Sequence, residues 1–464
     1  MKVTLVNPPY PKEAHQHPPF IPLSLGYLGA VCEKNGYEVN VIDCQGEKLS
    51  LEDFRRKLEK IDADVVGITS ATLTYKSALK VAKISKEVLP RCITVLGGCH
   101  ATFWDVNALN ECPDLDIIVR KEGEITFLDL LSKLKNKESL DEVQGVTFRK
   151  GDKIIRNEDR PYIENLDDLP FPAHHLLNLN SYIKVGKLII PVMTSRGCVY
   201  WCDFCTAVRM FGRKYRMRSP KNVVDELEFL HTKYGADQFT FYDDAFTVDP
   251  CRVEEICEEI MRRKLQIQWD CETRVDMVNK PLLEKMKKAG CIAVWFGVES
   301  GSQMMIDQMH KKFSIEQTKK AFKLAHEVDL MTIASIVLGF PGETEETAWE
   351  TINFVKSLDP NDVGFYIATP YPGTPLYETV KEKGWLKTED FDKYDTATPV
   401  FETPYLSMEK LKEIRFKALQ QFYLRPGYML KMLMKGGVYG ISAVKTSMAY
   451  LLRTLHVKLS ARMV

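Results

Sequence analysis

The stretch LIIPVMTSRGCVYWCDFC, residues 188–205, joins an apolar segment directly to three closely spaced cysteines. The apolar part predicts a buried strand over 188–195, and the loop after it carries Cys198, Cys202 and Cys205. Three thiolates in one short loop can ligate three irons of a cubane, which leaves the fourth iron open to a small molecule. Structural zinc is the alternative, but it normally takes four ligands, and no fourth Cys or His lies nearby in the sequence. The spacing therefore favours a 4Fe–4S cluster with one open iron.

Strands and helices continue to alternate beyond this loop. Continuous apolar stretches fit six buried strands, at 188–195, 238–244, 267–274, 292–300, 331–340 and 362–370. Amphipathic stretches between them fit helices. We therefore predict a partial six-unit (β/α) barrel over residues 188–406, whose functional groups lie at the carboxyl ends of the strands.

The first 135 residues show the same alternation, with five apolar strands separated by helices. Strands that are buried on both faces are typical of parallel sheets. We therefore predict an α/β fold with a doubly wound, Rossmann-like domain over 1–135, whose ligands bind at the carboxyl ends of the strands. Residues 136–187 are irregular apart from a small predicted hairpin, and we expect them to link the two domains.

Charge is unevenly distributed along the chain. The formal net charge is zero, yet residues 425–464 hold seven Lys or Arg and no Asp or Glu. We predict a basic helical tail over 407–464 that meets a local anionic partner, and no binding of nucleic acid. Twelve cysteines, most of them single within apolar stretches, indicate a reducing compartment, and the first residues lack the layout of a signal peptide. These features predict a cytoplasmic location.

The cysteine loop, residues 195–205, resembles that of the radical S-adenosylmethionine (SAM) superfamily, and the resemblance covers about residues 190–400. It implies an enzyme in which SAM binds the open iron and is cleaved reductively to methionine and a 5′-deoxyadenosyl radical. It also implies a reducing partner such as ferredoxin or flavodoxin. The residues that the resemblance places at contacts with SAM are Phe204, Asp243, Asp244, Arg274, Glu299, Ser300 and Gly339.

The two aspartates of this set depart from the family pattern, which usually has two glycines and a glutamate where the amino group of SAM binds. By resemblance, Phe204 lies near the adenine of SAM, and Gly339 permits close backbone approach to it. Arg274 would pair with the carboxylate of SAM, and Glu299 and Ser300 would reach the ribose. Each residue could instead be a capping or structural polar group, and both interpretations stay open at this point.

The N-terminal domain resembles the cobalamin-binding domains fused to radical SAM barrels, on the stretches GGCHAT (97–102) and RKEGE (120–124). The cobalamin contacts that it implies are Thr69, Ser70, Gly97, Gly98, His100, Glu122 and Gly123. Many cobalamin proteins carry Asp-x-His after the second strand, and that His ligates cobalt; here Asp43 is followed by Gln45 in the His position. Cobalamin would then bind without this His, and a plain doubly wound domain without cobalamin is the alternative. His100 lies either near the corrin edge or an interdomain site, or in a local hydrogen bond at a strand end.

The segment FYLRPGY, residues 422–428, resembles a stretch in the subgroup that contains the anaerobic magnesium-protoporphyrin cyclase and hopanoid- and archaeal-lipid-modifying enzymes. This resemblance implies radical C–H activation of a hydrophobic, lipid-like substrate, leading to C–C bond or ring formation. The alternatives are cobalamin-dependent methyl transfer to an unactivated carbon, tetrapyrrole cyclisation, and a non-catalytic corrinoid-binding or electron-carrier protein. Basic amphipathic helices over 425–464 favour peripheral contact with an anionic membrane, with packing on the barrel as the alternative. The sequence assigns no catalytic side chain.

Overall fold

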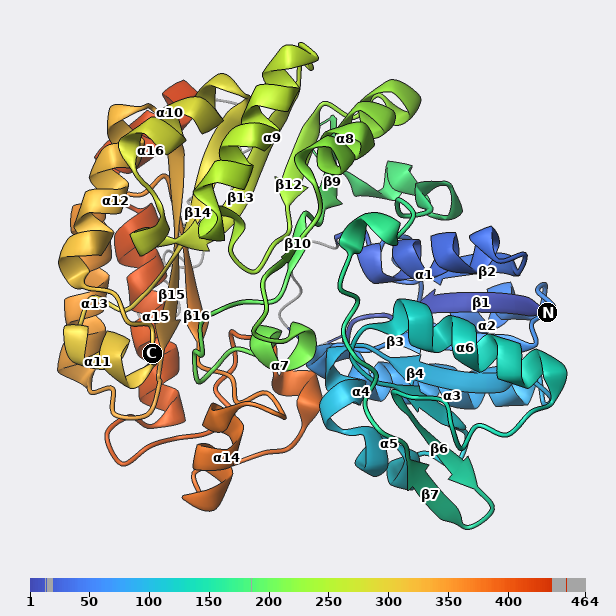
Figure 1. Ribbon diagram of the computed structural model, residues 1–464. Coiled ribbons are helices and arrows are strands. Elements are labelled where there is room, and N and C mark those ends of the chain that lie inside the picture. Colours follow the sequence, from blue (N-terminus) through green and yellow to red (C-terminus); the bar gives the residue numbers. More distant parts are fainter. Residues whose placement is uncertain (13, 15–19, 185, 436–447, 449–464) are drawn as a thin grey trace.

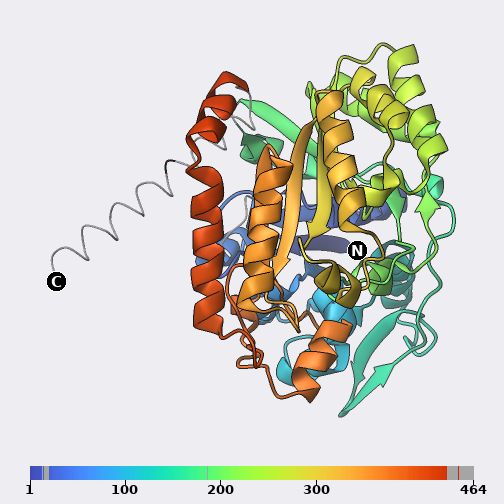
Figure 2. The ribbon, with the colours of Figure 1, turned by 90° about the vertical axis from the view of Figure 1, so that its left-hand side faces the viewer.

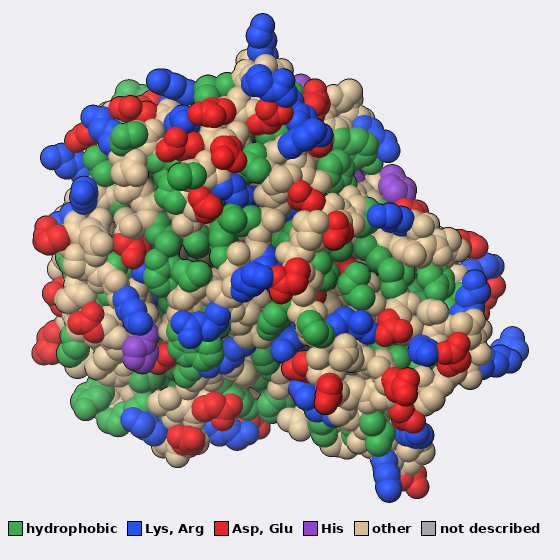
Figure 3. All heavy atoms as spheres, viewed as in Figure 1, with side chains coloured by type: hydrophobic (Ala, Val, Ile, Leu, Met, Phe, Trp, Pro, Cys, Tyr) green, Lys and Arg blue, Asp and Glu red, His purple; other side chains and the backbone are tan. Residues whose placement is uncertain are grey.

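The computed structural model describes residues 1–12, 14, 20–184, 186–435 and 448. Two α/β units stand side by side, each built on a seven-stranded sheet, and the irregular residues 157–182 lead from one unit to the other (Figure 1). The predicted architecture of a doubly wound domain, a partial barrel and a C-terminal helical segment is confirmed. Side chains of both charge signs are interspersed over the face shown in Figure 3, so that face carries no large region of one sign.

The N-terminal sheet has the strand order β2-β1-β3-β4-β5-β6-β7. Its first five strands are parallel, as predicted: β1 (Lys2–Asn7), β2 (Glu38–Asp43), β3 (Val65–Thr69), β4 (Ile93–Gly97) and β5 (Ile117–Val119). The helices of this unit are α1 (Leu23–Lys34), α2 (Leu51–Leu58), α3 (Tyr75–Val88), α4 (Cys99–Phe103), α5 (Asp105–Glu111) and α6 (Gly123–Asn136). Because α1 packs beside α6 and α2 packs beside α3, apolar cores form on both faces of the sheet, which accounts for the continuous apolar strands.

The predicted hairpin extends this sheet. β6 (Val146–Lys150) pairs antiparallel with β5, and β7 (Lys153–Arg156) pairs antiparallel with β6. The residue after β5 is Arg120, whose guanidinium is buried and needs acceptors. The chain that follows the hairpin supplies them, with Asp159 Oδ1 at 3.0 Å from Nε and the backbone carbonyl of Asn157 at 2.5 Å from Nη2. The sheet therefore continues past residue 135, where the sequence placed the end of the domain.

The second sheet has the strand order β16-β15-β14-β13-β12-β9-β8. The six predicted parallel strands are all present: β9 (Lys187–Val192), β12 (Gln238–Phe241), β13 (Gln268–Arg274), β14 (Cys291–Glu299), β15 (Met331–Leu338) and β16 (Asp362–Ile367). β8 (Ile183–Lys184) adds a short antiparallel edge. The predicted helices are also present: α8 (Pro220–Tyr234), α9 (Pro250–Arg262), α10 (Lys280–Lys288), α12 (Ile315–Glu327) and α13 (Glu345–Leu358).

Several short elements of the barrel unit were not anticipated, because so few residues give no readable periodicity. They are β10 (Ser195–Arg196), β11 (Arg216–Met217), α7 (Ala207–Phe211), α11 (Gln303–Gln308) and α14 (Pro375–Glu382).

After β16 the chain returns to the N-terminal unit. Residues 371–401 lie against α3 and α4, where the ring of Phe391 is 4.6 Å from that of His100 and Lys76 pairs with Asp390 at 2.5 Å. Apolar side chains of both units form one buried cluster there. The two units therefore share part of a core.

The first part of the predicted basic tail packs on the barrel. α15 (Met408–Tyr423) runs beside α13, and α16 (Pro426–Lys435) follows it (Figure 2). The hydroxyl of Tyr428 donates to the carbonyl of Asn361 at 2.9 Å, and Arg425 lies over the ring of Phe422, 4.4 Å from its centroid. The tail positions 436–447 and 449–464 lie outside the described residues. Within the described part of the chain, no helix is both long enough and apolar enough to cross a bilayer.

Replacing the buried ring of Phe422 tests how firmly this tail is docked. Phe422→Ala should lower the free energy of unfolding by about 3–5 kcal/mol, because the ring packs between Tyr423 and Tyr428 and leaves a cavity. Urea denaturation followed by circular dichroism measures the change. Leu430→Ala is the matched control: its side chain is 59% exposed on α16, and the expected change is within about 0.5 kcal/mol. Equally small effects from both variants would contradict the docking.

Candidate active site

The three cysteines lie on the loop between β10 and α7, next to the N-terminal unit (Figure 1). Gly197, which precedes Cys198, has a φ of +88°, and a Cβ there would lie 2.4 Å from a backbone oxygen. Glycine alone meets both conditions without strain. The N–H of Cys198 donates to the carbonyl of Gly212 at 3.3 Å, and that of Cys205 donates to the carbonyl of Cys202 at 3.2 Å. These contacts fix the backbone of the loop.

The three thiols suit an iron–sulfur cluster. All are free and partly exposed. Burial raises the pKa of each thiol, that of Cys205 to about 12, so their deprotonation must be coupled to metal binding. No group of three or more His, Cys, Asp or Glu that could hold one metal ion is found in the part of the chain that the structure describes. A cubane differs from such a site because each thiolate binds its own iron, so the donor set fits a 4Fe–4S cluster.

The two predicted aspartates have different surroundings. Asp243 is buried and accepts from the backbone N–H groups of Thr194 at 2.6 Å and Ser195 at 3.2 Å, and from both hydroxyls. It therefore joins the end of β12 to the chain that enters the cysteine loop. Asp244 is exposed, yet desolvation by surrounding protein and the charge of Asp243 raise its pKa to about 6. Of the two, Asp244 is the carboxylate available to the amino group of a ligand.

Arg274, the last residue of β13, retains an unused donor. Its guanidinium lies 3.5 Å from the ring centroid of Tyr200 in the cysteine loop and pairs with Asp276 at 2.9 Å. Nη2 donates to the carbonyl of Lys311 at 2.5 Å, whereas Nη1 is buried without a hydrogen-bond partner. A buried donor without a partner is costly, and a carboxylate is its strongest natural acceptor. This geometry fits the contact with the SAM carboxylate that the sequence predicts.

Glu299 and Lys311 form a buried ion pair at 2.7 Å. Burial alone would lower the pKa of Lys311, but the charges of Glu299 and Cys202 and the hydrogen bond to Glu299 together outweigh burial and raise the pKa. The ammonium of Lys311 also lies 5.7 Å from the ring centroid of Phe204. The pair therefore fixes a charged layer beside the ring that is expected near the adenine.

Ser300 and Gly339 meet other parts of the barrel. The hydroxyl of Ser300 bonds that of Thr351 on α13 at 2.9 Å, so it points to the helix layer, and the predicted ribose contact finds no support there. Gly339 follows β15, and the next residue, Phe340, meets Phe204 edge-on with ring centroids 6.4 Å apart. The residue after Gly339 therefore contacts the aromatic residue of the cysteine loop, whereas a Cβ on Gly339 itself would meet Leu411 of α15 at 2.4 Å. Its approach to the adenine stays a prediction.

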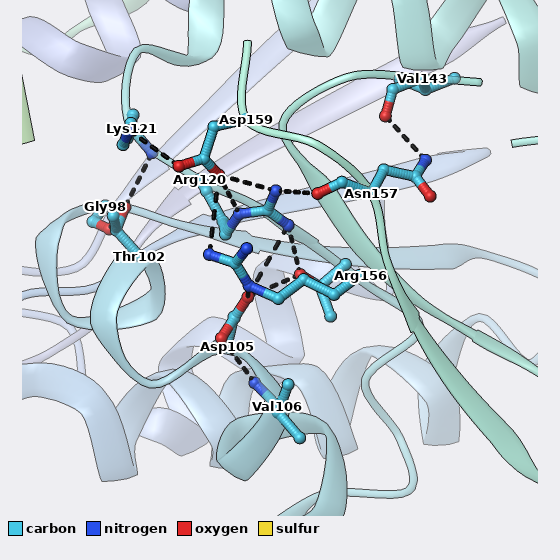
Figure 4. Close-up of polar contacts among 11 residues, drawn as sticks. Gly98, Thr102, Asp105, Val106, Arg120, Lys121, Val143, Arg156, Asn157 and Asp159 are labelled. Atoms are coloured by element: carbon cyan, nitrogen blue, oxygen red, sulfur yellow. Dashed lines mark hydrogen bonds and ion pairs between the residues drawn. The ribbon is translucent and has the colours of Figure 1, made fainter. Parts of the chain in front are cut away.

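Hydrogen bonds brace the predicted cobalamin loops. Gly98 has a φ of +98°, and a Cβ there would lie 2.5 Å from the carbonyl oxygen of Ser70. The hydroxyl of Ser70 donates to the carbonyl of Gly97 at 3.0 Å. The hydroxyl of Thr102 donates to the carbonyl of Gly98 and accepts from the N–H of Lys121, both at 2.9 Å (Figure 4). Hydrogen bonds therefore hold the loops after β3, β4 and β5 together at the carboxyl edge of the sheet. This edge exposes mainly backbone, which allows a large flat ligand to approach closely.

Glu122 joins the two units. It pairs with Arg196 at 3.1 Å and with Arg216 at 2.8 Å, and all three side chains are buried. Because Arg196 stands two residues before Cys198 in the cysteine loop, Glu122 has an interdomain role, and its predicted contact with cobalamin stays a prediction. Gly123 begins α6 and Thr69 ends β3, so both lie at the carboxyl edge of the sheet as predicted.

His100 is enclosed by aromatic rings. Its ring lies 4.2 Å from that of Tyr75 and 4.6 Å from that of Phe391, and Nδ1 lies 3.2 Å from the hydroxyl of Thr72. Burial lowers the pKa of His100 to about 3, so the ring is neutral. The structure contains the local hydrogen bond, and the contact with Phe391 also places His100 at the boundary between the two units. A contact with the corrin stays a prediction.

Gln45, in the position of the cobalt-ligating His, is held by the end of β1. Its Nε2 donates to Asn7 Oδ1 at 3.0 Å and to the carbonyl of Pro8 at 2.9 Å. Asn7 in turn donates to Asp43 at 2.8 Å. This position therefore offers a braced amide and no imidazole.

Sequence reasoning missed Tyr200, Lys311 and Glu272 as site residues. The partners of Tyr200 and Lys311 are distant in sequence, so no local signal marks them. The position of Glu272 could have been predicted. It stands two residues before Arg274 on β13, and because side chains in a strand alternate with a period of two, both lie on the same face.

Comparison with known proteins defines the class. The radical SAM superfamily matches residues 192–355, and the B12 binding domain matches residues 17–131. The chain is 36% identical over 410 residues to an uncharacterized methyltransferase of Pyrococcus horikoshii, covering 88% of this chain and 89% of the relative. It is 32% identical to the anaerobic magnesium-protoporphyrin IX monomethyl ester cyclase of Cereibacter sphaeroides, covering 92% and 71%. Its fold resembles that of OxsB with aqua-cobalamin and SAM bound, with a TM-score of 0.75 at 19% identity, covering 97% and 72%.

The chain therefore belongs to the radical SAM superfamily. It is an enzyme that combines the radical SAM barrel with a B12 binding domain, and its cofactors are a 4Fe–4S cluster, SAM and cobalamin. The resemblance stated from the cysteine loop and from residues 97–102 is confirmed.

Removing the unused donor tests the SAM contact. Arg274→Gln should weaken SAM binding to the cluster-loaded protein by roughly 10- to 150-fold, the equivalent of about 1.5–3 kcal/mol for a hydrogen bond to a charged group. Anaerobic isothermal titration measures the affinity. Arg262→Gln on the exposed face of α9 is the control and should leave it unchanged. Unaltered SAM affinity in Arg274→Gln, with normal iron content, would show that Nη1 faces no carboxylate.

Proposed function

We propose that the protein is a cobalamin-dependent radical SAM methyltransferase that adds a methyl group to an unactivated carbon. The observation that carries this proposal is the match to the Pyrococcus horikoshii methyltransferase, which extends over nearly the full length of both chains. The braced glycine edge of the N-terminal sheet supports a corrinoid at the carboxyl ends of its strands.

The side chains of this protein position and shield the reactants. When bound, the cluster and SAM supply radical chemistry, and cobalamin carries the methyl group. Nη1 of Arg274 offers a hydrogen bond to the carboxylate of SAM, and Asp244 offers an acceptor to its amino group. Residues 371–401 close the boundary between the two units with apolar side chains, which keeps water from the reacting groups.

Carbon–carbon bond or ring formation on a lipid-like substrate is the second candidate. The specific observation that favours it is the likeness to the magnesium-protoporphyrin cyclase, which spans most of this chain. A cyclase uses SAM for hydrogen abstraction alone, whereas a methyltransferase must also move a methyl group, so the products of SAM separate the two candidates.

The test follows the methyl group of SAM. The holoenzyme with reduced cobalamin, incubated anaerobically with SAM that carries a deuterated methyl group, should give labelled corrinoid and an equal amount of S-adenosylhomocysteine. Mass spectrometry of both products makes the measurement. Cys202→Ala, which lacks one cluster ligand, is the control and should form no 5′-deoxyadenosine. Formation of 5′-deoxyadenosine by the intact enzyme with no label in the corrinoid would overturn methyl transfer in favour of the second candidate.

The reducing partner has a suitable surface beside the cluster loop. Trp201, between two of the cysteines, is 41% exposed. Arg209 and Arg213 lie over its ring, 4.4 and 5.7 Å from the centroid. Within the described ranges, no carboxylate lies at ion-pair distance from either guanidinium. We propose that an acidic electron carrier of the flavodoxin type docks on this basic, aromatic surface, which shortens the path from donor to cluster.

Charge reversal at this surface should slow electron transfer from a protein reductant and leave reduction by a small molecule unchanged. The double variant Arg209→Glu, Arg213→Glu should slow cluster reduction by reduced flavodoxin about tenfold or more at low salt, because steering is lost. Stopped-flow absorbance at the cluster band measures the rate, and Arg262→Glu on α9 is the matched control. Reduction by dithionite, which needs no docking, should keep its rate. Equal slowing with dithionite would trace the effect to a damaged cluster and contradict the docking surface.

We also propose peripheral contact of the tail with an anionic membrane, through which a hydrophobic substrate would reach the barrel. Leu430 and Met434 are exposed apolar side chains on α16, which supports shallow insertion. Of the seven basic residues from Arg425 onward, Arg425 and Lys431 already pair with Asp359 on the barrel. The electrostatic attraction in such contact therefore depends on the five basic positions from 435 onward.

A further inference from the structure

β13 presents a row of charged residues to the barrel interior. Trp269 and Cys271 are fully buried in the core that joins the strands to the outer helices. The alternate residues, Asp270 and Glu272, therefore point to the opposite side, in line with Arg274. Glu272 is exposed although both of its neighbours in the strand are buried.

The exposed carboxyl of Glu272 faces the barrel interior, the space on the opposite side of the sheet from the apolar core, which we call the hollow. Desolvation by surrounding protein raises its pKa to about 7, and the charges of Asp270, Asp244 and Glu299 add to the rise. A carboxyl on the outer surface keeps its water and would show no such desolvation. A group that is both accessible and desolvated is consistent with this position on the inner face of the sheet.

Three aromatic side chains share this hollow with Glu272. Tyr242, just past β12, is 50% exposed, yet desolvation and the charge of Glu272 raise its pKa to about 12. Tyr366 on β16 also has a pKa raised to about 12, first by desolvation and then by Glu272. Because β14 and β15 separate β13 from β16 in the sheet, this influence acts across the hollow. Trp295 on β14 stands in register with Glu272, and its buried Nε1 has no hydrogen-bond partner.

The charges around this layer favour a positive ligand. The charges of Asp270 and Asp244 both act on Glu272, and Asp270 shares its face of β13. Arg274 and Lys311, which lie beside the rings of Tyr200 and Phe204, already pair with Asp276 and Glu299. Arg415, whose charge acts on Tyr366, donates to the backbone carbonyl of Phe365 at 2.8 Å. A purely hydrocarbon ligand would bury the carboxyl and the indole N–H without partners, which costs free energy. A cation among aromatic faces is stabilised both by cation–π attraction to the rings and by the charge of the carboxylate.

We infer that Tyr242, Glu272, Trp295 and Tyr366 form the substrate-recognition layer of the barrel and that it takes a planar or aromatic group bearing a cationic nitrogen. The layer lies two residues deeper in the barrel than Arg274, about 6.6 Å along the strand, and so leaves the SAM contacts free. The inference rests on the proposed function, because it assigns the substrate class of that enzyme. It narrows the expectation of a lipid-like substrate to an amphipathic one.

Three small probes that share one ring test the layer. Benzylamine, benzyl alcohol and benzoate carry a positive, neutral and negative group, and saturation-transfer NMR with the holoenzyme gives their affinities. Benzylamine should bind best and benzoate worst. Glu272→Gln should weaken benzylamine about tenfold and leave benzyl alcohol unchanged. Glu350→Gln, an exposed glutamate on α13, is the matched control and should change neither.

The dependence on pH gives a second readout. The affinity for benzylamine should fall as the pH drops from 8 to 6, because the proton and the cation compete for Glu272. Asp244, Asp270, Glu299, Tyr242 and Tyr366 also face this group, and Glu272→Gln should remove most of the pH dependence if Glu272 is its source.

Equal binding of benzylamine and benzoate by the intact enzyme, or a preference for benzylamine that survives in Glu272→Gln, would overturn the inference. Probe binding needs no turnover, and methyl transfer from SAM to the corrinoid needs no substrate. The failure of this inference is therefore distinguishable from the failure of the proposed function.

Discussion

Four buried charged side chains hold the two units together: Glu122 and Glu124 from the N-terminal unit, and Arg196 and Arg216 from the barrel unit. Burial alone would raise the pKa of Glu124, but the charge of Arg196 and its hydrogen bond lower it. The stabilisation is therefore complete above the ordinary pKa of a carboxyl and is lost as the pH falls through the lowered value. Removing one partner of such a pair typically costs about 3–5 kcal/mol, because the other charge stays buried.

The position of this ion-pair cluster explains why the active site depends on both units. Arg196 stands two residues before Cys198, so the N-terminal unit fixes the start of the loop that carries all three thiols. Residues 371–401 make the second connection, through Phe391 and the rings of Tyr75 and His100. The loops at the carboxyl ends of both sheets are thereby held at one boundary, which suits a reaction that joins a radical centre to a corrinoid.

Much of this arrangement could be predicted from the sequence, because it follows from local patterns of apolar residues and cysteine spacing. Apolar stretches and amphipathic helices predicted the strands of both sheets, and the cysteine spacing predicted the cluster loop. Which side chains contact one another depends on the tertiary structure, so these contacts could not be predicted from local sequence patterns. Asp243 and Asp244 are neighbours in sequence, yet one braces Thr194 and Ser195 while the other faces the interior. Nothing local shows that Glu122 meets Arg196 or that Ser300 turns to α13.

One buried ion-pair cluster holds the carboxyl edge of the N-terminal sheet against the cysteine loop. The most direct test is the distance between the two metal centres, measured by pulsed electron paramagnetic resonance on holoenzyme that holds cob(II)alamin and the reduced cluster. We predict one narrow distance distribution in the intact protein and a broader one in Glu124→Gln, in which Arg196 loses a partner. No dipolar coupling in the intact protein, or an unchanged narrow distribution in the variant, would contradict it.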